Sequence, residues 1–266
     1  MLAVATTEPE LSRLEARLSE FGLRSFIVAE PSRSRRVALA TFVDGAATAR
    51  IAATLRIEGL MAVTRPDGGA ALSAWLRDTR PVTVRARLTV CLAWSEHDRT
   101  DLPGLLEIGP GGFGSGHHPT TLMLLEGLAD RIEGGERVLD VGCGSGVLGL
   151  GALRLGAAAG LGIDLKPEAV EAARRNAELN GMMERFDASA SPLEQIADRF
   201  DTVVANVARA GIVSLAPQLL ARLAPGGWLA VSGITPGQCE QVGAFLRPLE
   251  EEGRRVEGDW ASLVFS

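Results

Sequence analysis

Apolar residues in the first part of the chain switch between helical and strand-like spacing. Leu11, Leu14 and Leu18 recur every three or four residues within the segment 9–22, which predicts a helix. Strand-like stretches are expected at 23–30, 35–42 and 60–65, and a second helix at 46–59. This order of elements is typical of a small α+β domain in which helices cover one face of an antiparallel sheet.

The second part of the chain, from about residue 105, alternates between strand-like and helix-like segments. The expected strands are 137–142, 160–164, 201–206, 227–233 and 261–266, and the expected helices are 145–156, 166–181, 212–223 and 235–246. Such alternation indicates parallel strands joined by right-handed helical crossovers. The sequence therefore predicts an α/β fold with a doubly wound, Rossmann-like sheet and a smaller N-terminal α+β domain.

These patterns divide the 266 residues into three segments. We expect residues 1–75 to form the small α+β domain, residues 76–104 to connect, and residues 105–266 to form the larger domain. Within the connector, residues 83–94 are strand-like and suit a bridging hairpin.

Composition excludes several classes of protein. The formal net charge of −6 argues against a protein that coats nucleic acid. The three cysteines, Cys91, Cys143 and Cys239, form neither a CxxC motif nor a disulfide framework. The N-terminal residues lack the basic and apolar regions of a signal peptide, and no apolar run approaches the roughly 18 residues of a membrane span. We therefore expect a cytoplasmic protein with no membrane partner.

A glycine-rich turn follows the first strand of the predicted sheet. Residues 140–146 read Asp-Val-Gly-Cys-Gly-Ser-Gly and open the next helix. Glycine lets the backbone turn tightly and approach a ligand closely, and ligands bind at this edge of such sheets. A dinucleotide fingerprint would need its third glycine at Val147, so that class of ligand is disfavoured. A glycine-rich turn without any ligand is the structural alternative.

Three motifs together carry a family resemblance. The DxGxGxG pattern of residues 140–146 resembles the S-adenosyl-L-methionine (SAM) loop of class I methyltransferases. Residues 113–121 read Phe-Gly-Ser-Gly-His-His-Pro-Thr-Thr, and residues 203–206 read Val-Val-Ala-Asn. At this spacing the three motifs resemble the ribosomal protein L11 methyltransferase family, whose corresponding first stretch reads FGTGTHPTT. The resemblance is close from about residue 108 to residue 246 and weaker over residues 1–80.

The resemblance implies SAM as cofactor and a set of site residues. The implied cofactor-binding residues are Phe113, Gly114, Gly116, Thr121, Asp140, Gly142, Gly144, Asp164 and Asn206. Among them, Asn206 is also the implied catalytic residue beside the methyl group. Asp164 would hold the ribose, although a carboxylate there can also cap the helix that follows. Residues 113–116 would form a lid over the cofactor.

The residues after Asn206 bear on the methyl acceptor. Methyltransferases that act on base amino groups place Pro-Pro-aromatic there, so that a flipped base can stack on the ring. This chain has Val207, Ala208 and Arg209, where the family usually has Ile-Leu-Ala. A nucleic-acid base is therefore disfavoured and a flexible alkyl amine is favoured.

The histidines and Cys143 call for simpler interpretations. His97, His117 and His118 have no carboxylate or cysteine partner at ligand spacing, so we expect no metal site. His118 is expected to order its loop. Cys143 begins a helix, where a thiol pKa can fall, but it lacks a base and is expected to be a small loop residue.

The resemblance implies a SAM-dependent protein methyltransferase that modifies lysine ε-amines of ribosomal protein L11, with the α-amine as a further candidate acceptor. In this family the N-terminal domain recognises the protein substrate. Because that domain is the least similar part, an acceptor such as an electron-transfer flavoprotein subunit, or a small-molecule amine, is the first alternative. The others are a non-catalytic SAM-binding or ribosome-associated module and a dinucleotide dehydrogenase, which the glycine spacing disfavours.

Overall fold

The computed structural model describes residues 2–7, 18, 20, 26–29, 36–41, 51, 61–64, 80–93, 97–109, 114 and 116–266. Apart from Leu18, Glu20 and Ile51, the helices predicted at 9–22 and 46–59 lie outside these residues. Two compact units can be distinguished. One comprises Met1–Pro81, Cys91–Thr100 and Gly109–Gly111, and the other Val82–Val90, Asp101–Ile108 and Gly112–Ser266. The domain limits at residues 75 and 104 stay a prediction.

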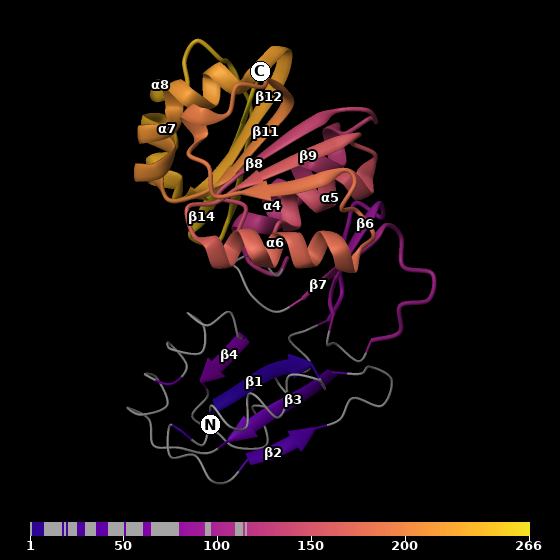
Figure 1. Cartoon of the computed structure of the whole chain (residues 1–266). Coiled ribbons are helices and arrows are strands. Elements are labelled where there is room, and N and C mark those ends of the chain that lie inside the picture. The colour runs from indigo at the N-terminus through magenta and orange to yellow at the C-terminus, as the bar shows by residue number, and fades with distance from the viewer. Residues whose placement is uncertain are drawn as a thin grey trace. The chain divides into compact units, whose positions relative to one another are not determined.

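The first unit contains a four-stranded antiparallel sheet (Figure 1). Its strands, in the order β2-β3-β1-β4, are β1 (Leu2–Thr7), β2 (Phe26–Ala29), β3 (Arg36–Thr41) and β4 (Met61–Thr64). The antiparallel sheet and its strands β2, β3 and β4 confirm the strands predicted at 23–30, 35–42 and 60–65. Strand β1, which precedes the first predicted helix, is an addition.

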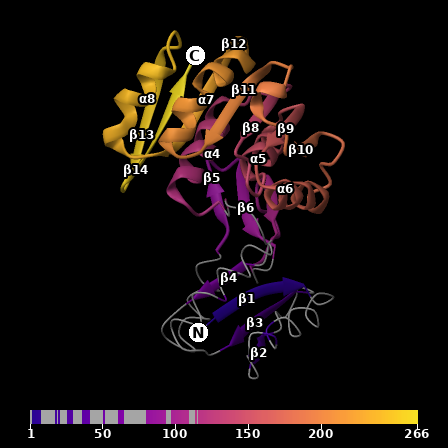
Figure 2. The same ribbon diagram turned by 60° about the vertical axis from the view of Figure 1, so that its left-hand side comes forward.

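The second unit is built on a seven-stranded sheet of order β10-β9-β8-β11-β12-β14-β13 (Figures 1 and 2). The strands are β8 (Arg137–Val141), β9 (Ala159–Ile163), β10 (Phe186–Ser189), β11 (Phe200–Asn206), β12 (Leu223–Ile234), β13 (Glu251–Glu257) and β14 (Trp260–Phe265). The helices are α4 (Pro119–Arg131), α5 (Val147–Leu155), α6 (Pro167–Leu179), α7 (Arg209–Arg222) and α8 (Cys239–Phe245), with the short 3-10 turns η1 (Leu193–Gln195) and η2 (Pro236–Gln238). None of the described helices has the length and apolar character required to cross a membrane.

The sheet confirms the doubly wound fold but not the parallel course of every strand. Strands β10, β9, β8, β11 and β12 are parallel neighbours, whereas β14 is antiparallel to both β12 and β13. Only Gly258 and Asp259 separate β13 from β14. Because no helix can fit into so short a connection, the chain has to reverse direction there.

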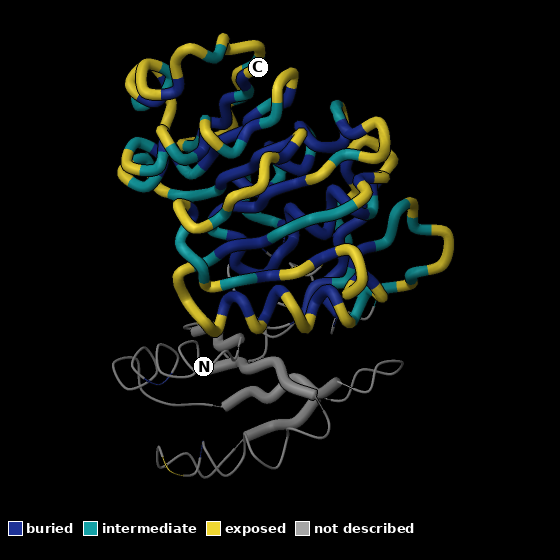
Figure 3. Tube along the Cα trace, turned by 45° about the horizontal axis from the view of Figure 1, so that its top comes forward, coloured by how far each residue is buried: buried dark blue, intermediate teal, exposed yellow. Residues whose placement is uncertain are grey.

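The two faces of this sheet bury different residues. On strand β8, Leu139 and Val141 join the apolar cluster beneath α7 and α8, whereas Asp140 faces α5. Helix α5 can pack closely on the sheet because residue 149 is a glycine. A Cβ at this position would lie only 2.5 Å from Phe186 Cε2. Buried residues follow the strands and the inner faces of the helices, as Figure 3 shows.

A hairpin attaches to the second unit from outside the main sheet. Strands β5 (Val82–Val84) and β6 (Leu88–Leu92) pair with three residues between them, and β6 is also the sheet neighbour of β7 (Leu105–Ile108). Arg85 and Ala86 in the turn both have a φ of 51°, the left-handed conformation that such turns require. This hairpin lies within the segment for which a bridging hairpin was predicted.

Arg87 fastens the hairpin to the ends of two helices. Its guanidinium donates to Ala129 O and Ile132 O at the end of α4, and to Leu155 O at the end of α5 at 3.4 Å. These carbonyls belong to the last turns of the helices, which have no partner within the helix. The hairpin therefore supplies a C-terminal cap for both helices.

We expect Arg87→Ala to lower the free energy of unfolding by about 1–3 kcal/mol, since it removes a charged donor from helix-end carbonyls. The matched control is Arg85→Ala. It removes only part-exposed ion pairs with Glu126 and Asp130, so its loss should be about 0–1 kcal/mol. Urea unfolding of both variants measures the difference. Equal losses would show that Arg87 does not cap the helices.

Candidate functional site

The glycine-rich turn after β8 is fixed by the end of strand β9. Gly142 N and Cys143 N both donate to Ile163 O, at 2.8 and 3.0 Å. Gly142, Gly144 and Gly146 have φ values of 73°, 54° and 78°, a region that residues with a Cβ seldom adopt. A Cβ at Gly142 would also lie 2.5 Å from the Cγ1 atom of Val207. The turn thus requires glycine, both for its conformation and for its contact with the residue after β11.

Asp164, directly after β9, is held against the same turn. Its Oδ2 accepts from Gly144 N at 3.1 Å and its Oδ1 from Lys166 N at 3.0 Å. The N-cap of α6 is Lys166, so the capping interpretation of Asp164 is wrong, although its carboxylate still orders the chain before the helix. Asp164 is half-buried, and each carboxylate oxygen keeps a second lone pair. The group can therefore accept hydrogen bonds from the hydroxyls of a ligand.

Thr121 and Asn206 meet at the same edge of the sheet. Thr121 lies fully buried in the first turn of α4, and Asn206 ends β11. Asn206 Nδ2 donates to Thr121 Oγ1 at 3.2 Å. Because the amide nitrogen is held by the hydroxyl, the carbonyl oxygen Oδ1 lies on the opposite side of the carboxamide. It is then available to accept from an amine.

The predicted lid divides into parts with different surroundings. Gly114 O accepts from Ser145 Oγ at 2.6 Å, which brings this residue to the glycine-rich turn. Gly116 instead packs on β6, where its Cβ would lie 2.9 Å from Val90 Cγ1. Phe113 lies outside the described residues. Of the predicted set, the structure thus brings Gly114, Gly142, Gly144 and Asp164 together at one turn.

Two polar residues that the sequence analysis missed support this turn. Ser145 is buried, and its backbone oxygen accepts from Asn176 Nδ2 at 2.8 Å. Asn176 is a buried polar residue on the face of α6 that otherwise buries Ala169, Val170, Ala172, Ala173 and Ala177. A polar residue at helical spacing among alanines was the signal that could have revealed it.

Asp140 lies beneath the site. Its side chain is fully buried, with Oδ2 accepting from Gly149 N at 3.0 Å and Oδ1 without a hydrogen-bond partner among the described residues. Burial raises the pKa of this carboxyl to about 7, and the charge of Asp164 adds to the shift, whereas the Gly149 N–H opposes it. Asp140 thus supports α5 and is a buried group that changes charge near neutral pH.

The structure agrees with the simpler interpretations of Cys143 and His118. Burial raises the pKa of the Cys143 thiol well above its usual range, so this residue remains a protonated loop residue. His118 orders its loop as expected, because it is the N-cap of α4 and its Nδ1 lies 2.8 Å from Thr120 Oγ1. Within the described ranges, no three His, Cys, Asp or Glu side chains gather as a metal site would require.

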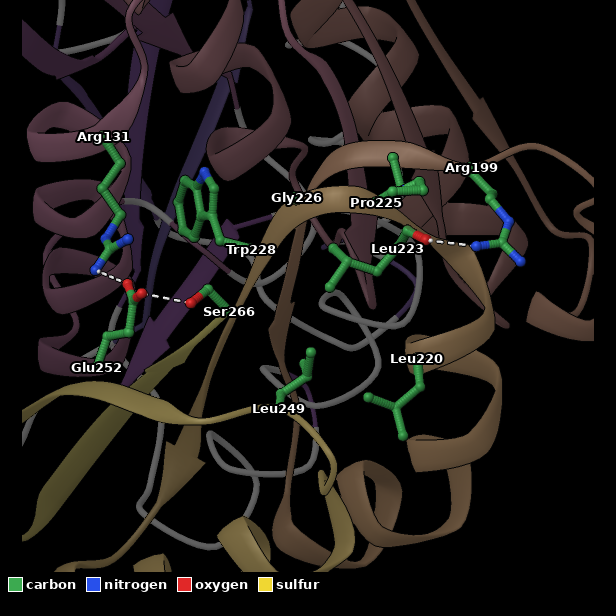
Figure 4. Close-up of a pocket in the computed structure, with 12 residues that line it drawn as sticks. Arg131, Arg199, Leu220, Leu223, Pro225, Gly226, Trp228, Leu249, Glu252 and Ser266 are labelled. Carbon is green, nitrogen blue, oxygen red and sulfur yellow. Dashed lines mark hydrogen bonds and ion pairs between the residues drawn. The ribbon is translucent and has the colours of Figure 1, made fainter.

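A cavity of about 590 Å³ lies elsewhere, where β12 begins and β14 ends (Figure 4). Arg131 is paired there with Glu252 at 2.7 Å and lies over the Trp228 ring at 5.5 Å, and Arg199 donates to Leu223 O at 3.2 Å. Each of these arginines thus already has a partner. We therefore place the candidate site at the glycine-rich turn, where the carboxyl ends of the parallel strands meet.

The sheet order, the glycine-rich turn after β8 and the carboxylate after β9 define a class I methyltransferase fold. The crystal structure of ribosomal protein L11 methylase from Lactobacillus delbrueckii subsp. bulgaricus matches with a TM-score of 0.65 and 27% identity, over 70% of this chain and 98% of that chain. The family model described as ribosomal protein L11 methyltransferase (PrmA) matches residues 72–266. The chain therefore belongs to the ribosomal protein L11 methyltransferase family, as its motifs predicted.

Curated relatives agree with this assignment. A protein named ribosomal protein L11 methyltransferase from Geobacter sp. (strain M21) is 42% identical over 199 residues, which are 72% of this chain and 65% of that protein. One of the same name from Chromohalobacter salexigens is 42% identical over 189 residues, or 67% of this chain and 62% of that protein. The chain thus spans less than two thirds of the length of these relatives.

The buried Asp140 makes a testable contribution to the pH dependence of stability. Its folded pKa of about 7 lies above the ordinary value of 3.8, so between these values the folded state holds a proton that the unfolded state has lost. The carboxyl therefore favours folding at low pH and loses this advantage as the pH rises to about 7. Asp140→Asn removes the titration. We expect the unfolding free energy of the wild type minus that of the variant to fall between pH 4 and 7, by up to about 1.4 kcal/mol per pH unit. Denaturant unfolding over this range measures it, and a constant difference would contradict the burial argument.

Proposed function

We propose that this protein transfers methyl groups from SAM to amines of a protein substrate, chiefly lysine ε-amines and also the α-amine, with ribosomal protein L11 as the acceptor. The observation that carries the proposal is the Asn206 carboxamide. It is held by Thr121 at the end of β11, beside a glycine-rich turn with a carboxylate bonded to it. The names of the curated relatives support the choice of acceptor.

The residues at the turn fit SAM. The left-handed glycines allow the tight turn of residues 142–146, and Asp164 retains lone pairs for two ribose hydroxyls. We assign Gly142 and Gly144 to the methionine side and Asp164 to the ribose. When bound, SAM supplies a methyl group made electrophilic by its sulfonium.

The protein has to deliver a neutral amine. A free lysine has a pKa of about 10.4, so roughly one molecule in a thousand is uncharged near neutral pH. Transfer to a desolvated site beside a sulfonium disfavours the ammonium form and lowers that pKa. Asn206 Oδ1 then accepts an N–H of the amine and directs its lone pair toward the methyl carbon. Such alignment is worth several kcal/mol of the barrier.

The carboxylates nearby are engaged in other ways. Asp140 is buried beneath α5, and Asp164 accepts from two backbone N–H groups. We therefore assign no general base among them. The amine gives its proton to bulk water as it leaves the solvent, because desolvation disfavours the ammonium form. Val207, which follows Asn206, contacts the Gly142 backbone through an aliphatic side chain. It offers no aromatic surface for a base, in agreement with an alkyl amine acceptor.

The direct test is methyl transfer in an extract. The purified protein would be incubated with labelled SAM and a cell extract that lacks the endogenous activity, and labelled proteins would be identified by mass spectrometry. We expect label on ribosomal protein L11. Label on another protein would support transfer but reject L11, which matters because the family match starts at residue 72. SAM binding without any label would favour the non-catalytic module.

Two substitutions separate chemistry from cofactor binding. Asn206→Ala should lower kcat by about 100-fold or more, while the Kd for SAM stays within about threefold, because it removes a group that acts mainly in the transition state. Asp164→Ala should raise the Kd for SAM at least about tenfold, through loss of charged hydrogen bonds. Calorimetry and steady-state kinetics measure both quantities.

The matched control is Asp198→Ala. Asp198 is an exposed carboxylate that forms an ion pair with Arg137. Arg137 is the first residue of β8, and the glycine-rich turn follows the last residue of that strand. It should leave kcat and Kd unchanged. Equal effects of Asn206→Ala on kcat and on SAM affinity would reject the catalytic assignment of Asn206.

A further inference from the structure

An aromatic contact joins the hairpin β13–β14 to the start of helix α4. The rings of Trp260 and His118 pack edge to face, with centroids 5.2 Å apart and an interplanar angle of 65°. Trp260 is the first residue of β14, and His118 is the N-cap of α4. Both residues are half-buried. The contact thus lies at the same edge of the sheet as the glycine-rich turn.

Hydrogen bonds connect His118 to the first turn of α4, which contains Thr121. Its Nδ1 lies 2.8 Å from Thr120 Oγ1 and accepts from Thr120 N at 3.4 Å. Its backbone oxygen accepts from Thr121 N at 2.9 Å. A displacement of the His118 ring would therefore move the first turn of α4, which carries the hydroxyl that holds the Asn206 amide.

The sheet also connects Asn206 to the strand that carries Trp260. Asn206 on β11 is the register partner of Ser232 on β12, and Ser232 Oγ donates to Ala261 O at 2.8 Å. Ala261 directly follows Trp260. The chain of contacts from Asn206 through Thr121, His118 and Trp260 thus returns to Asn206 across two neighbouring strands.

The contact is not needed to keep the hairpin on the protein. Ala261, Leu263 and Phe265 of β14 are buried in the core beneath α7 and α8. On β13, Arg255 forms an ion pair with Glu126 of α4 at 2.7 Å. These interactions hold both strands on the protein without the Trp260 ring. The contact of this half-buried ring with His118 can therefore act on the position of α4.

We propose that Trp260 and His118 are positioning residues, which hold the first turn of α4 so that Thr121 keeps the Asn206 carbonyl directed at the acceptor amine. The proposal rests on the proposed function, and it adds the hairpin β13–β14 to the parts that prepare methyl transfer. A misplacement of about 1 Å in a reacting geometry can cost about 100-fold in rate.

Kinetics provides the first test. Trp260→Leu should lower kcat by about 10- to 100-fold, with the Kd for SAM within about twofold, and Trp260→Phe should recover most of the rate through its aromatic edge. The matched control is Trp228→Leu, at the cavity on the opposite edge of the sheet, which should leave kcat unchanged. A Trp260→Leu variant with wild-type kcat, or with kcat and SAM affinity lost in parallel, would overturn the proposal.

Two further variants separate positioning from folding. His118→Asn keeps a side chain suited to the N-cap but removes the ring, so it should reproduce the kcat loss even if Trp260→Leu fails to fold. In an Asn206→Ala background, Trp260→Leu should cost less than about twofold more, because both changes act through one group. A His118→Asn variant with wild-type kcat, or fully additive losses, would reject the proposal.

NMR tests the structural part without any catalysis. The chain contains only three asparagines and four glutamines, so its side-chain amide signals are few. The Asn206 signal is identified by its absence in Asn206→Ala. We expect it to shift in Trp260→Leu and to stay in place in Trp228→Leu; an unchanged signal in Trp260→Leu would overturn the inference. If the wild type transfers no methyl group while this shift occurs, the proposed function fails and the positioning contact stands.

Discussion

The candidate site depends on one acceptor atom, the backbone oxygen of Ile163 at the end of β9. Two successive N–H groups, from Gly142 and Cys143, converge on it and force the chain to turn as it leaves β8. The turn then continues through glycines in left-handed conformations into α5. Since the same strand end leads into Asp164, the carboxylate and the turn are positioned by one feature of the backbone and need no separate adjustment.

The other half of the site comes from a helix outside the alternating pattern. Helix α4 precedes the first strand of the main sheet in sequence, yet its first turn reaches Asn206 at the end of β11. The glycine-rich turn therefore fixes one side of the site through backbone hydrogen bonds, whereas side chains fix the other. A site assembled in this way can keep the side formed by the turn constant while the side formed by Thr121 and Asn206 changes with a few side chains.

The sequence predicted the parts of the site that local chemistry determines. The glycines at 142 and 144 are short-range requirements of one turn, so their spacing indicated them, whereas the acid at 164 entered through the family resemblance. The Thr121–Asn206 pair was reached only through a family resemblance, because the two residues are 85 positions apart. The contact of Trp260 with His118 carried no signal in the order of residues, since it depends on how the last hairpin folds back over the sheet.

The fold was predictable to a similar degree. Strands buried in the centre of the sheet have apolar runs that predicted them, whereas β13 reads Glu-Glu-Gly-Arg-Arg-Val-Glu and has no such run. This edge strand is held by its pairing with β14 and by ion pairs such as that of Arg255 with Glu126. An edge strand with charged residues also resists pairing with other chains. The polar composition of β13 thus follows from its place at the edge of the sheet. The same composition is the reason why the hydrophobic pattern did not predict this strand.

The capping of α4 and α5 by Arg87 bears on how this family could exchange its N-terminal parts in evolution. The helix-end carbonyls accept from Arg87, which lies between β5 and β6. The unit with the seven-stranded sheet therefore begins in sequence well before its glycine-rich turn. A crossover between two genes that fell between β6 and α4 would combine a hairpin and helix ends that had not evolved together. A crossover before β5 would keep them as one inherited piece. The β5–β6 hairpin therefore marks the position at which a different N-terminal domain could be joined without disturbing the unit that carries the glycine-rich turn.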